Sequence, residues 1–191
     1  MIFESMLLSI IVGFIRRGKL TNLAHIPLRR IYLFAVPLAL YAVAYLLMRT
    51  TNDHILLLCT RATNILQYVV LLAAIGVNLH IREMRLMGLG TFLNFLALSV
   101  NGGVMPVHPR AVELAGMTAM FDAQRGTELV RHLIMTPETR LKLLIDIIPL
   151  PGYGPHLPEV ASIGDVLLAI GIFVLVQRYM CSPRSWSKAK E

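Results

Sequence analysis

Charged residues are scarce in this sequence: they make up 15% of its 191 positions, against about a quarter in ordinary soluble domains. Acidic residues are the scarcer kind, with 11 against 18 lysines and arginines, which gives a formal net charge of +7. Hydrophobic residues supply 56% of the chain, a composition typical of an integral membrane protein. In such a protein the positive charge is explained by cytoplasmic basic loops, so we expect no nucleic-acid partner.

Cysteines and metal-binding spacings are also scarce. Cys59 lies in an apolar run and Cys181 in the basic tail, which predicts neither a disulfide nor a metal site. The six histidines are dispersed, and neither an i, i+4 pair nor an accompanying cysteine supports zinc binding. The sequence also lacks a glycine-rich phosphate loop and a serine nucleophile-elbow motif. We therefore expect no metal and no cofactor.

Apolar runs divide the chain into five expected transmembrane helices. They lie near residues 1–15, 31–48, 55–79, 86–105 and 163–180. Residues 106–158 are too polar to span and too apolar for a disordered linker, so we expect short amphipathic helices there, on the outer face. The apolar spacing places them near residues 112–117, 129–134 and 136–148. The predicted fold is an all-α, polytopic membrane helix bundle forming a single domain.

Basic residues gather in alternate connections between these runs. They are Arg16, Arg17, Lys19, Arg29, Arg30, Arg82, Arg85, Arg178, Arg184, Lys188 and Lys190. Because basic loops stay in the cytoplasm, this pattern predicts an N-terminus outside and a C-terminus inside, with residues 106–158 on the outer side. We read the first apolar run as a retained span, since it lacks the basic start and the small-residue cleavage site of a secretory signal.

The fourth apolar run ends in Asn101, Gly102 and Gly103, and two prolines follow shortly after. Glycine loosens the backbone and proline removes a donor, so the helix must break there. Freed backbone groups at a membrane edge need water, protein or a ligand, which makes this break the expected functional site. Asn94 lies seven residues before Asn101, so we expect both on one face, in a polar line leading to the break. Gly88 favours close helix packing.

Polar residues inside the third and fifth runs point to the same place. Arg61, Asn64 and Gln67 are spaced by three, so they share a helical face that should turn into the bundle. Asp165 lies in the first turn of the last run, where it either stabilises its own helix or forms part of a site. Arg61 is its natural internal partner. The predicted outer pocket is lined by Asn101, Gly102, Gly103, Asp165, Arg61 and Asn94.

Asp146 and Asp165 form a second candidate site, because two adjacent carboxylates can share a proton and activate a water. The stretches 144–148 and 162–165, with Gly171, resemble the last part of bacterial lipoprotein signal peptidase. The resemblance places Asp165 at a catalytic aspartate and implies an intramembrane aspartic peptidase. Two positions of that motif differ, and the Gly-Asn-x-x-Asp-Arg motif of the other catalytic aspartate is absent.

The whole chain resembles a group of small bacterial multi-pass membrane proteins of unknown function. The similar pieces are residues 14–20, 101–107 and 163–165. This resemblance implies a bacterial cytoplasmic membrane and no particular activity. Two hypotheses stay open: an accessory, non-catalytic protein that binds membrane lipid, a lipid-modified peptide or another membrane protein at the outer face, or an aspartic peptidase using Asp165 and Asp146. A transporter ranks third, because five spans without inverted halves do not favour alternating access.

Overall fold

The computed structural model describes residues 1–48, 54–118, 132–152 and 158–181. Long helices dominate it, as the apolar runs predict. They are α1 (Ile2–Ile15), α2 (Tyr32–Met48), α3 (His54–Gly76), α4 (Arg82–Val100) and α7 (Ile163–Met180). A 3-10 helix, η1 (Leu20–His25), follows α1. The third helix ends three residues before its expected limit, and the fourth begins and ends earlier than expected.

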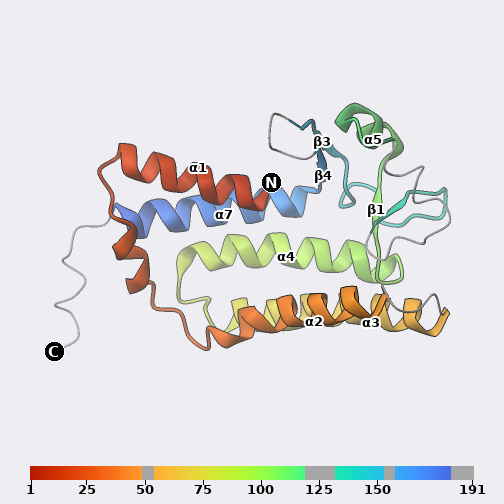
Figure 1. Cartoon of the computed structure of the whole chain (residues 1–191), viewed down its shortest axis with the longest axis horizontal. Coiled ribbons are helices and arrows are strands. Elements are labelled where there is room, and N and C mark those ends of the chain that lie inside the picture. The colour runs from red at the N-terminus through yellow and green to blue at the C-terminus, as the bar shows by residue number, and fades with distance from the viewer. Residues whose placement is uncertain (49–53, 119–131, 153–157, 182–191) are drawn as a thin grey trace.

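The five long helices lie side by side along one axis (Figure 1). Helix α7 packs against α1 on one side and α4 on the other, and α3 packs against both α4 and α2. The order across the bundle is therefore α1, α7, α4, α3, α2. Helix α7 thus lies between α1 and α4, with its N-terminus beside the C-terminal half of α4.

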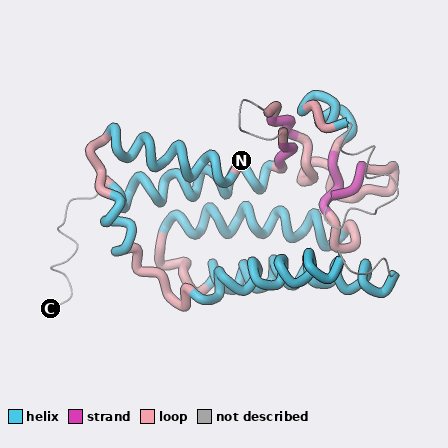
Figure 2. Tube along the Cα trace, in the orientation of Figure 1, coloured by secondary structure: helices cyan, strands magenta, loops and turns pink. Residues whose placement is uncertain are grey.

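A small module of strands and one short helix lies at the end of the bundle where α4 stops and α7 starts (Figure 2). Strand β1 (Met105–Val107) pairs in parallel with β2 (His132–Ile134), and β3 (Ile148–Leu150) pairs antiparallel with β4 (Glu159–Ala161). Helix α5 (Pro109–Ala115) contacts β3 and β4. We call residues 104–118, 132–152 and 158–162 the outer module.

These strands correct the all-α prediction for residues 106–158. The first of the three expected short helices is present as α5, but the described part of the second, His132–Ile134, is a strand. The third, expected over 136–148, is replaced by turns that lead into β3. Backbone pairing is the reason: the Ile147 N–H donates to the Ala161 carbonyl at 3.1 Å, so it is not available for a helix. Pairing with a distant segment overrides the local helical spacing.

Glycines bring α4 close to its neighbours. A Cβ on Gly90 would lie 2.4 Å from the Gly164 carbonyl oxygen of α7, and a Cβ on Gly164 would lie 2.6 Å from the Gly90 oxygen. On the other side of α4, a Cβ on Gly88 would lie 3.1 Å from Ile75 of α3. The expected close packing at Gly88 is therefore present, and a second contact through Gly90 joins α4 to α7.

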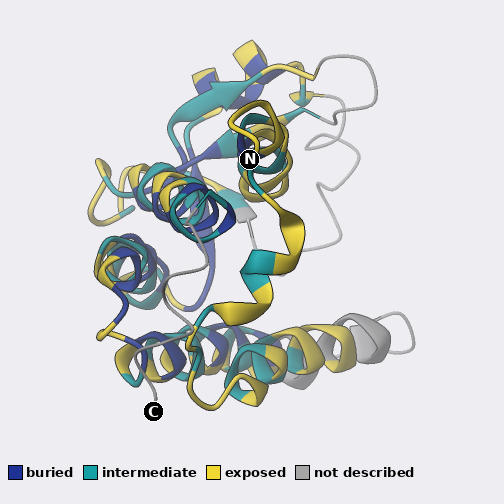
Figure 3. Ribbon diagram, turned by 90° about the vertical axis from the view of Figure 1, so that its left-hand side faces the viewer, coloured by how far each residue is buried: buried dark blue, intermediate teal, exposed yellow. Residues whose placement is uncertain are grey.

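Several large apolar side chains are exposed, and several polar side chains are buried. Large apolar side chains are exposed on all five long helices, up to 75% for Ile15 and 70% for Leu38. In contrast, Ser9, Asn64 and Asn94 are buried between helices. Figure 3 shows exposed residues along the outer sides of the helices and buried residues where the helices meet.

Two stretches among the described residues are both long and apolar enough to cross a membrane. They are Leu58–Gly76 within α3 and Ile163–Met180, which is α7. Helix α1 and the Tyr32–Val43 part of α2 are apolar but shorter. Length and composition therefore weakly suggest a membrane location.

Candidate functional site

The predicted break after α4 is confirmed. The helix ends at Val100, and Gly102 and Gly103 follow with φ values of +74° and +83°. Such left-handed backbone is readily adopted by glycine, whereas other residues are strained there. Position 103 also has no room for a side chain, because a Cβ there would lie only 2.5 Å from the Arg61 carbonyl oxygen. The break therefore presses directly against α3.

Asn64 of α3 fixes this contact. Its Nδ2 donates to the Gly103 carbonyl oxygen at 3.0 Å, and its side chain is buried. Gln67 is also buried and Arg61 is half-buried, so this face of α3 turns into the bundle as its spacing predicts. The Asn64 amide therefore satisfies a backbone carbonyl that the break leaves without a helical partner. The sequence predicts that such freed groups need a new partner at this point.

Asn101 holds a distant turn of the outer module. The Arg140 N–H donates to Asn101 Oδ1 at 2.9 Å, and Asn101 Nδ2 donates to the Arg140 carbonyl at 3.1 Å. The same Nδ2 also bonds the Ala97 carbonyl at 2.7 Å. Asn94 instead bonds residues of α7, so the two asparagines do not form the predicted polar line. Asn101 lies past the helix end, in the cap, where its side chain reaches the outer module.

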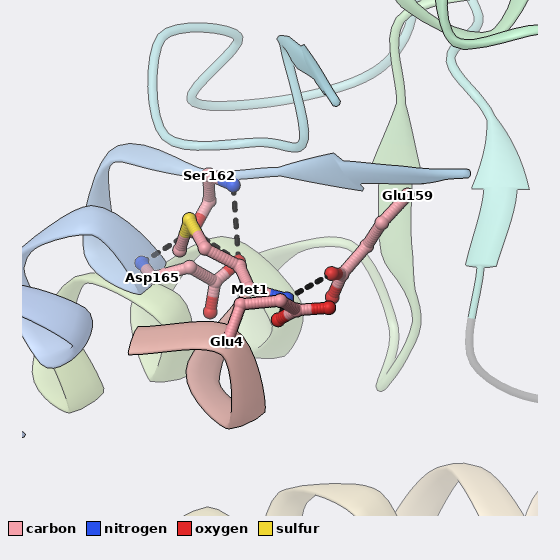
Figure 4. Close-up of polar contacts among 5 residues, drawn as sticks. All are labelled: Met1, Glu4, Glu159, Ser162 and Asp165. Atoms are coloured by element: carbon pink, nitrogen blue, oxygen red, sulfur yellow. Dashed lines mark hydrogen bonds and ion pairs between the residues drawn. The ribbon is translucent and has the colours of Figure 1, made fainter. Parts of the chain in front are cut away.

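Asp165 closes a capping box at the start of α7 (Figure 4). The Asp165 N–H donates to Ser162 Oγ at 3.0 Å, and the Ser162 N–H donates to Asp165 Oδ2 at 3.0 Å. Asn94 of α4 joins the cap, because its Nδ2 donates to Asp165 Oδ1 at 2.8 Å and its Oδ1 accepts from the Ser162 hydroxyl at 2.7 Å. These bonds fix the N-terminus of α7 to α4.

The expected pair between Arg61 and Asp165 is therefore not formed, since the hydrogen bonds of Asp165 go to Ser162 and Asn94. The same bonds count against shared-proton catalysis, because Asp146 is not among the partners of Asp165 either. Asp146 is buried beside β1, where its N–H donates to the Pro106 carbonyl at 3.1 Å. Asp165 Oδ2 serves the helix cap, the structural role that its position in the first turn predicts, and Oδ1 bonds Asn94 of α4.

Residues near the start of α1 also contact the outer module and α7. The Met1 amino group forms ion pairs with Glu4 and Glu159 (Figure 4). Partial burial acts to lower the pKa of this amino group, but the two carboxylates outweigh it and raise the pKa above 8.0. The Ser5 hydroxyl donates to the Ala169 carbonyl of α7 at 2.7 Å. These contacts connect α1 to both β4 and α7.

Sequence reasoning missed Ser162 and Arg140. The pattern Ser162-x-x-Asp165 before an apolar run is a capping-box signature, so the role of Ser162 was open to prediction. Arg140 takes part through its backbone, for which the sequence carries no signal. Among the described residues, no group of three or more His, Cys, Asp or Glu side chains is placed to hold a metal ion.

Polar contacts at the opposite end of the bundle secure the basic segments. Arg178 of α7 pairs with the buried carboxylate of Glu83 of α4 at 3.0 Å. The Asn78 side chain bonds both the N–H and the carbonyl of Arg29, at 2.7 and 3.0 Å. This basic connection is therefore held against the bundle.

The fold and this site define a class of protein: a bundle of apolar helices with a small outer module tied to the broken end of α4. The chain belongs to the family of unknown function DUF5317, whose model matches residues 25–177. It is 30% identical, over 187 residues, to an uncharacterized protein of Thermotoga maritima, a match that covers 96% of each chain. No solved structure matches. The predicted resemblance to a family of unknown function is confirmed, and the likeness to lipoprotein signal peptidase is not shown.

Proposed function

We propose that this protein is a multi-pass integral protein of the bacterial cytoplasmic membrane, crossed by α1, α2, α3, α4 and α7. The observation that carries the proposal is the outward exposure of large apolar side chains on all five helices, while asparagine, glutamine, serine and threonine side chains lie between the helices together with apolar ones. In water such a surface would cost free energy and cause association, whereas lipid covers it without penalty. Buried polar groups then serve as contacts between helices.

Helix α1 is the shortest of the five, and its length is compatible with a span. Its 14 residues extend about 21 Å at 1.5 Å per residue, short of a hydrocarbon core of roughly 30 Å. Arg16 and Arg17 directly follow it, and long basic side chains can reach from within the membrane edge to the headgroups. Local thinning of the bilayer accommodates the remaining mismatch at modest cost.

The two ends of the bundle carry different charges, which supports an N-out, C-in orientation. The described basic residues at the end away from the outer module are Arg16, Arg17, Lys19, Arg29, Arg30, Arg82, Arg85 and Arg178. Glu83 is the acidic residue there, and it is paired with Arg178. The described acidic residues toward the opposite end outnumber the basic ones; they are Glu4, Glu113, Glu138, Asp146, Glu159 and Asp165, against Arg61, Arg110, Arg140 and Lys142. By the positive-inside rule the outer module is extracytoplasmic.

At that outer face the protein has an accessory, non-catalytic role, in which it binds membrane lipid, a peptide or another membrane protein. The polar groups of the predicted pocket act as its support: Asn101 and Gly103 hold the outer module and α3, while Asn94 and Asp165 hold α7. Arg61 backs the break from α3 through its main chain. A rigid platform of this kind positions a binding surface precisely enough for a partner without supplying a reactive group.

Cysteine labelling tests the orientation. In a variant without native cysteines (Cys59→Ser, Cys181→Ser), Glu113→Cys, at an exposed position of α5 in the outer module, should react with a membrane-impermeant maleimide on intact cells. His80→Cys at the other end should react only after the membrane is permeabilised. The reverse pattern, or labelling of both on intact cells, would refute the proposed orientation.

Co-purification tests the binding role. The protein extracted in mild detergent should carry a lipid, peptide or protein that mass spectrometry identifies. Asn101→Leu should lose this component while retaining insertion, because it releases the Arg140 turn. Asn22→Leu is the matched control, since Asn22 Nδ2 bonds the Met180 carbonyl at the opposite end of the bundle. Equal co-purification with both variants would count against an outer-face role.

A further inference from the structure

The turn at residues 140–143 of the outer module has an unusual combination of features. Asn101 clamps its backbone from both sides at Arg140. The Leu144 N–H closes the turn by donating to the Leu141 carbonyl at 2.8 Å, and Lys142 Nζ donates to the Pro137 carbonyl at 3.2 Å. The turn is therefore held in one conformation.

That conformation exposes leucine. Leu141 has φ of +51°, a left-handed backbone that leucine rarely adopts. Its side chain is 44% exposed and that of Leu143 is 75% exposed. The turn therefore presents two large apolar side chains to the surroundings of the protein. Strained backbone held in place by its surroundings is a feature of binding segments.

Basic side chains alternate with these leucines. Arg140 and Lys142 are both exposed. Glu138 is the acidic residue of the same segment, and a hydrogen bond from Thr136 lowers the pKa of its carboxyl group, so it stays ionised at neutral pH and offsets one of the two positive charges. The exposed tip itself, residues 140–143, carries only positive charge.

The position of the turn identifies the surface that it meets. Asn101 ties it to the cap of α4, one residue after Val100, whose apolar side chain is itself 39% exposed. If α4 crosses the membrane, this cap lies at the outer boundary of the bilayer. The turn is then continuous with the lipid-facing surface of the bundle.

We infer that residues 140–143 form an interfacial anchor for anionic phospholipid of the outer leaflet. Leu141 and Leu143 enter the boundary of the acyl chains, while Arg140 and Lys142 contact phosphodiester headgroups. This pairing of apolar and cationic side chains is how segments lying on a membrane bind it. The inference rests on the proposed membrane orientation and names lipid as the ligand of the outer face.

Tryptophan fluorescence in vesicles tests the anchor. The single tryptophan of the chain, Trp186, is replaced by phenylalanine, and one tryptophan is introduced as Leu143→Trp, Leu114→Trp or Leu66→Trp. Leu114 is a matched control, because it is 58% exposed on α5 of the same module, and Leu66 is 49% exposed on α3. The vesicles contain phosphatidylcholine and phosphatidylglycerol, with bromine on the acyl chains of one or the other.

Brominated lipid should quench the tryptophan at position 143 at least about twofold more than that at position 114. Quenching at position 66 but not at 143 would overturn the anchor and leave the membrane proposal standing. Absence of quenching at position 66 would refute the membrane proposal itself. Shielding of position 143 from aqueous acrylamide without lipid quenching would overturn the anchor in favour of a protein occupant.

Headgroup choice is tested in the same Leu143→Trp protein. Brominated phosphatidylglycerol should quench more strongly than brominated phosphatidylcholine at equal bromine content. The double variant Arg140→Gln, Lys142→Gln should abolish that preference, and the same two substitutions in the Leu66→Trp protein should leave its quenching unchanged. Equal quenching by the two lipids with the native basic residues would overturn the recognition of anionic headgroups.

Discussion

Alanine at Gly103 should destabilise the protein more than alanine at Gly102, although both glycines have left-handed backbone. The conformational cost is shared, at about 1–2 kcal/mol for each substitution. At Gly103 the new Cβ would also lie 2.5 Å from the Arg61 carbonyl oxygen, whereas at Gly102 no atom lies within 4 Å. Overpacking of this kind adds about 1–3 kcal/mol. The difference between the two variants therefore isolates the contact between the break and α3.

Thermal unfolding in detergent, followed by circular dichroism, measures this difference. About 1 kcal/mol corresponds to a shift of roughly 2–4 °C in Tm for a chain of this size, so Gly103→Ala should unfold about 2–12 °C below Gly102→Ala. When both glycine variants are made in an Asn64→Ala background, most of the difference in Tm between them should disappear. The break is then no longer bonded to α3. Equal Tm values for Gly102→Ala and Gly103→Ala would refute the close approach of the break to α3.

Four further predictions concern other contacts of the bundle. Ser162→Ala should lower the free energy of unfolding by about 0.5–2 kcal/mol in chemical denaturation, because it removes a capping oxygen. Asp165→Asn should cause no accumulation of a membrane precursor in cells, and such accumulation would revive the peptidase hypothesis. Asn78→Ala should speed tryptic cleavage at Arg29 and Arg30, since three side-chain hydrogen bonds of Asn78 are lost, two of them to Arg29, and unchanged proteolysis would contradict this role. Gly90→Ala should cost about 1–3 kcal/mol, because its Cβ would meet the Gly164 oxygen, while Gly76→Ala, with open space around it, serves as the control.

The helices of the bundle were predictable because each long apolar run can satisfy its own backbone. The break after α4 was also predictable, because Gly102 and Gly103 have little preference for a helix and stand at the end of such a run. The inward face of α3 also followed from the spacing of Asn64 and Gln67. These predictions depend on local chemistry, which the sequence carries directly.

The outer module was not predictable in the same way. Its strands are three residues long and pair with segments far along the chain, so residues 141–148 have helical spacing but no helix. The predicted partner of Asp165 was wrong for a related reason. Charge suggested Arg61 of α3, whereas α7 packs against α4. Asn94 is the partner instead, and the close approach of α4 to α7 at Gly90 and Gly164 makes room for this contact.

We propose that lipid covers the outward-facing apolar side chains of the five helices. Spin labels test this in vesicles. Each label is attached to a cysteine introduced into the cysteine-free variant at Leu38, Leu66 or Ile170, and a label at Leu114 of the outer module is the comparison. If lipid covers the helices, the labels at Leu38, Leu66 and Ile170 are accessible to oxygen and shielded from a water-soluble nickel chelate, and the label at Leu114 gives the opposite result. Free access of the chelate to Leu38, Leu66 and Ile170 would contradict it.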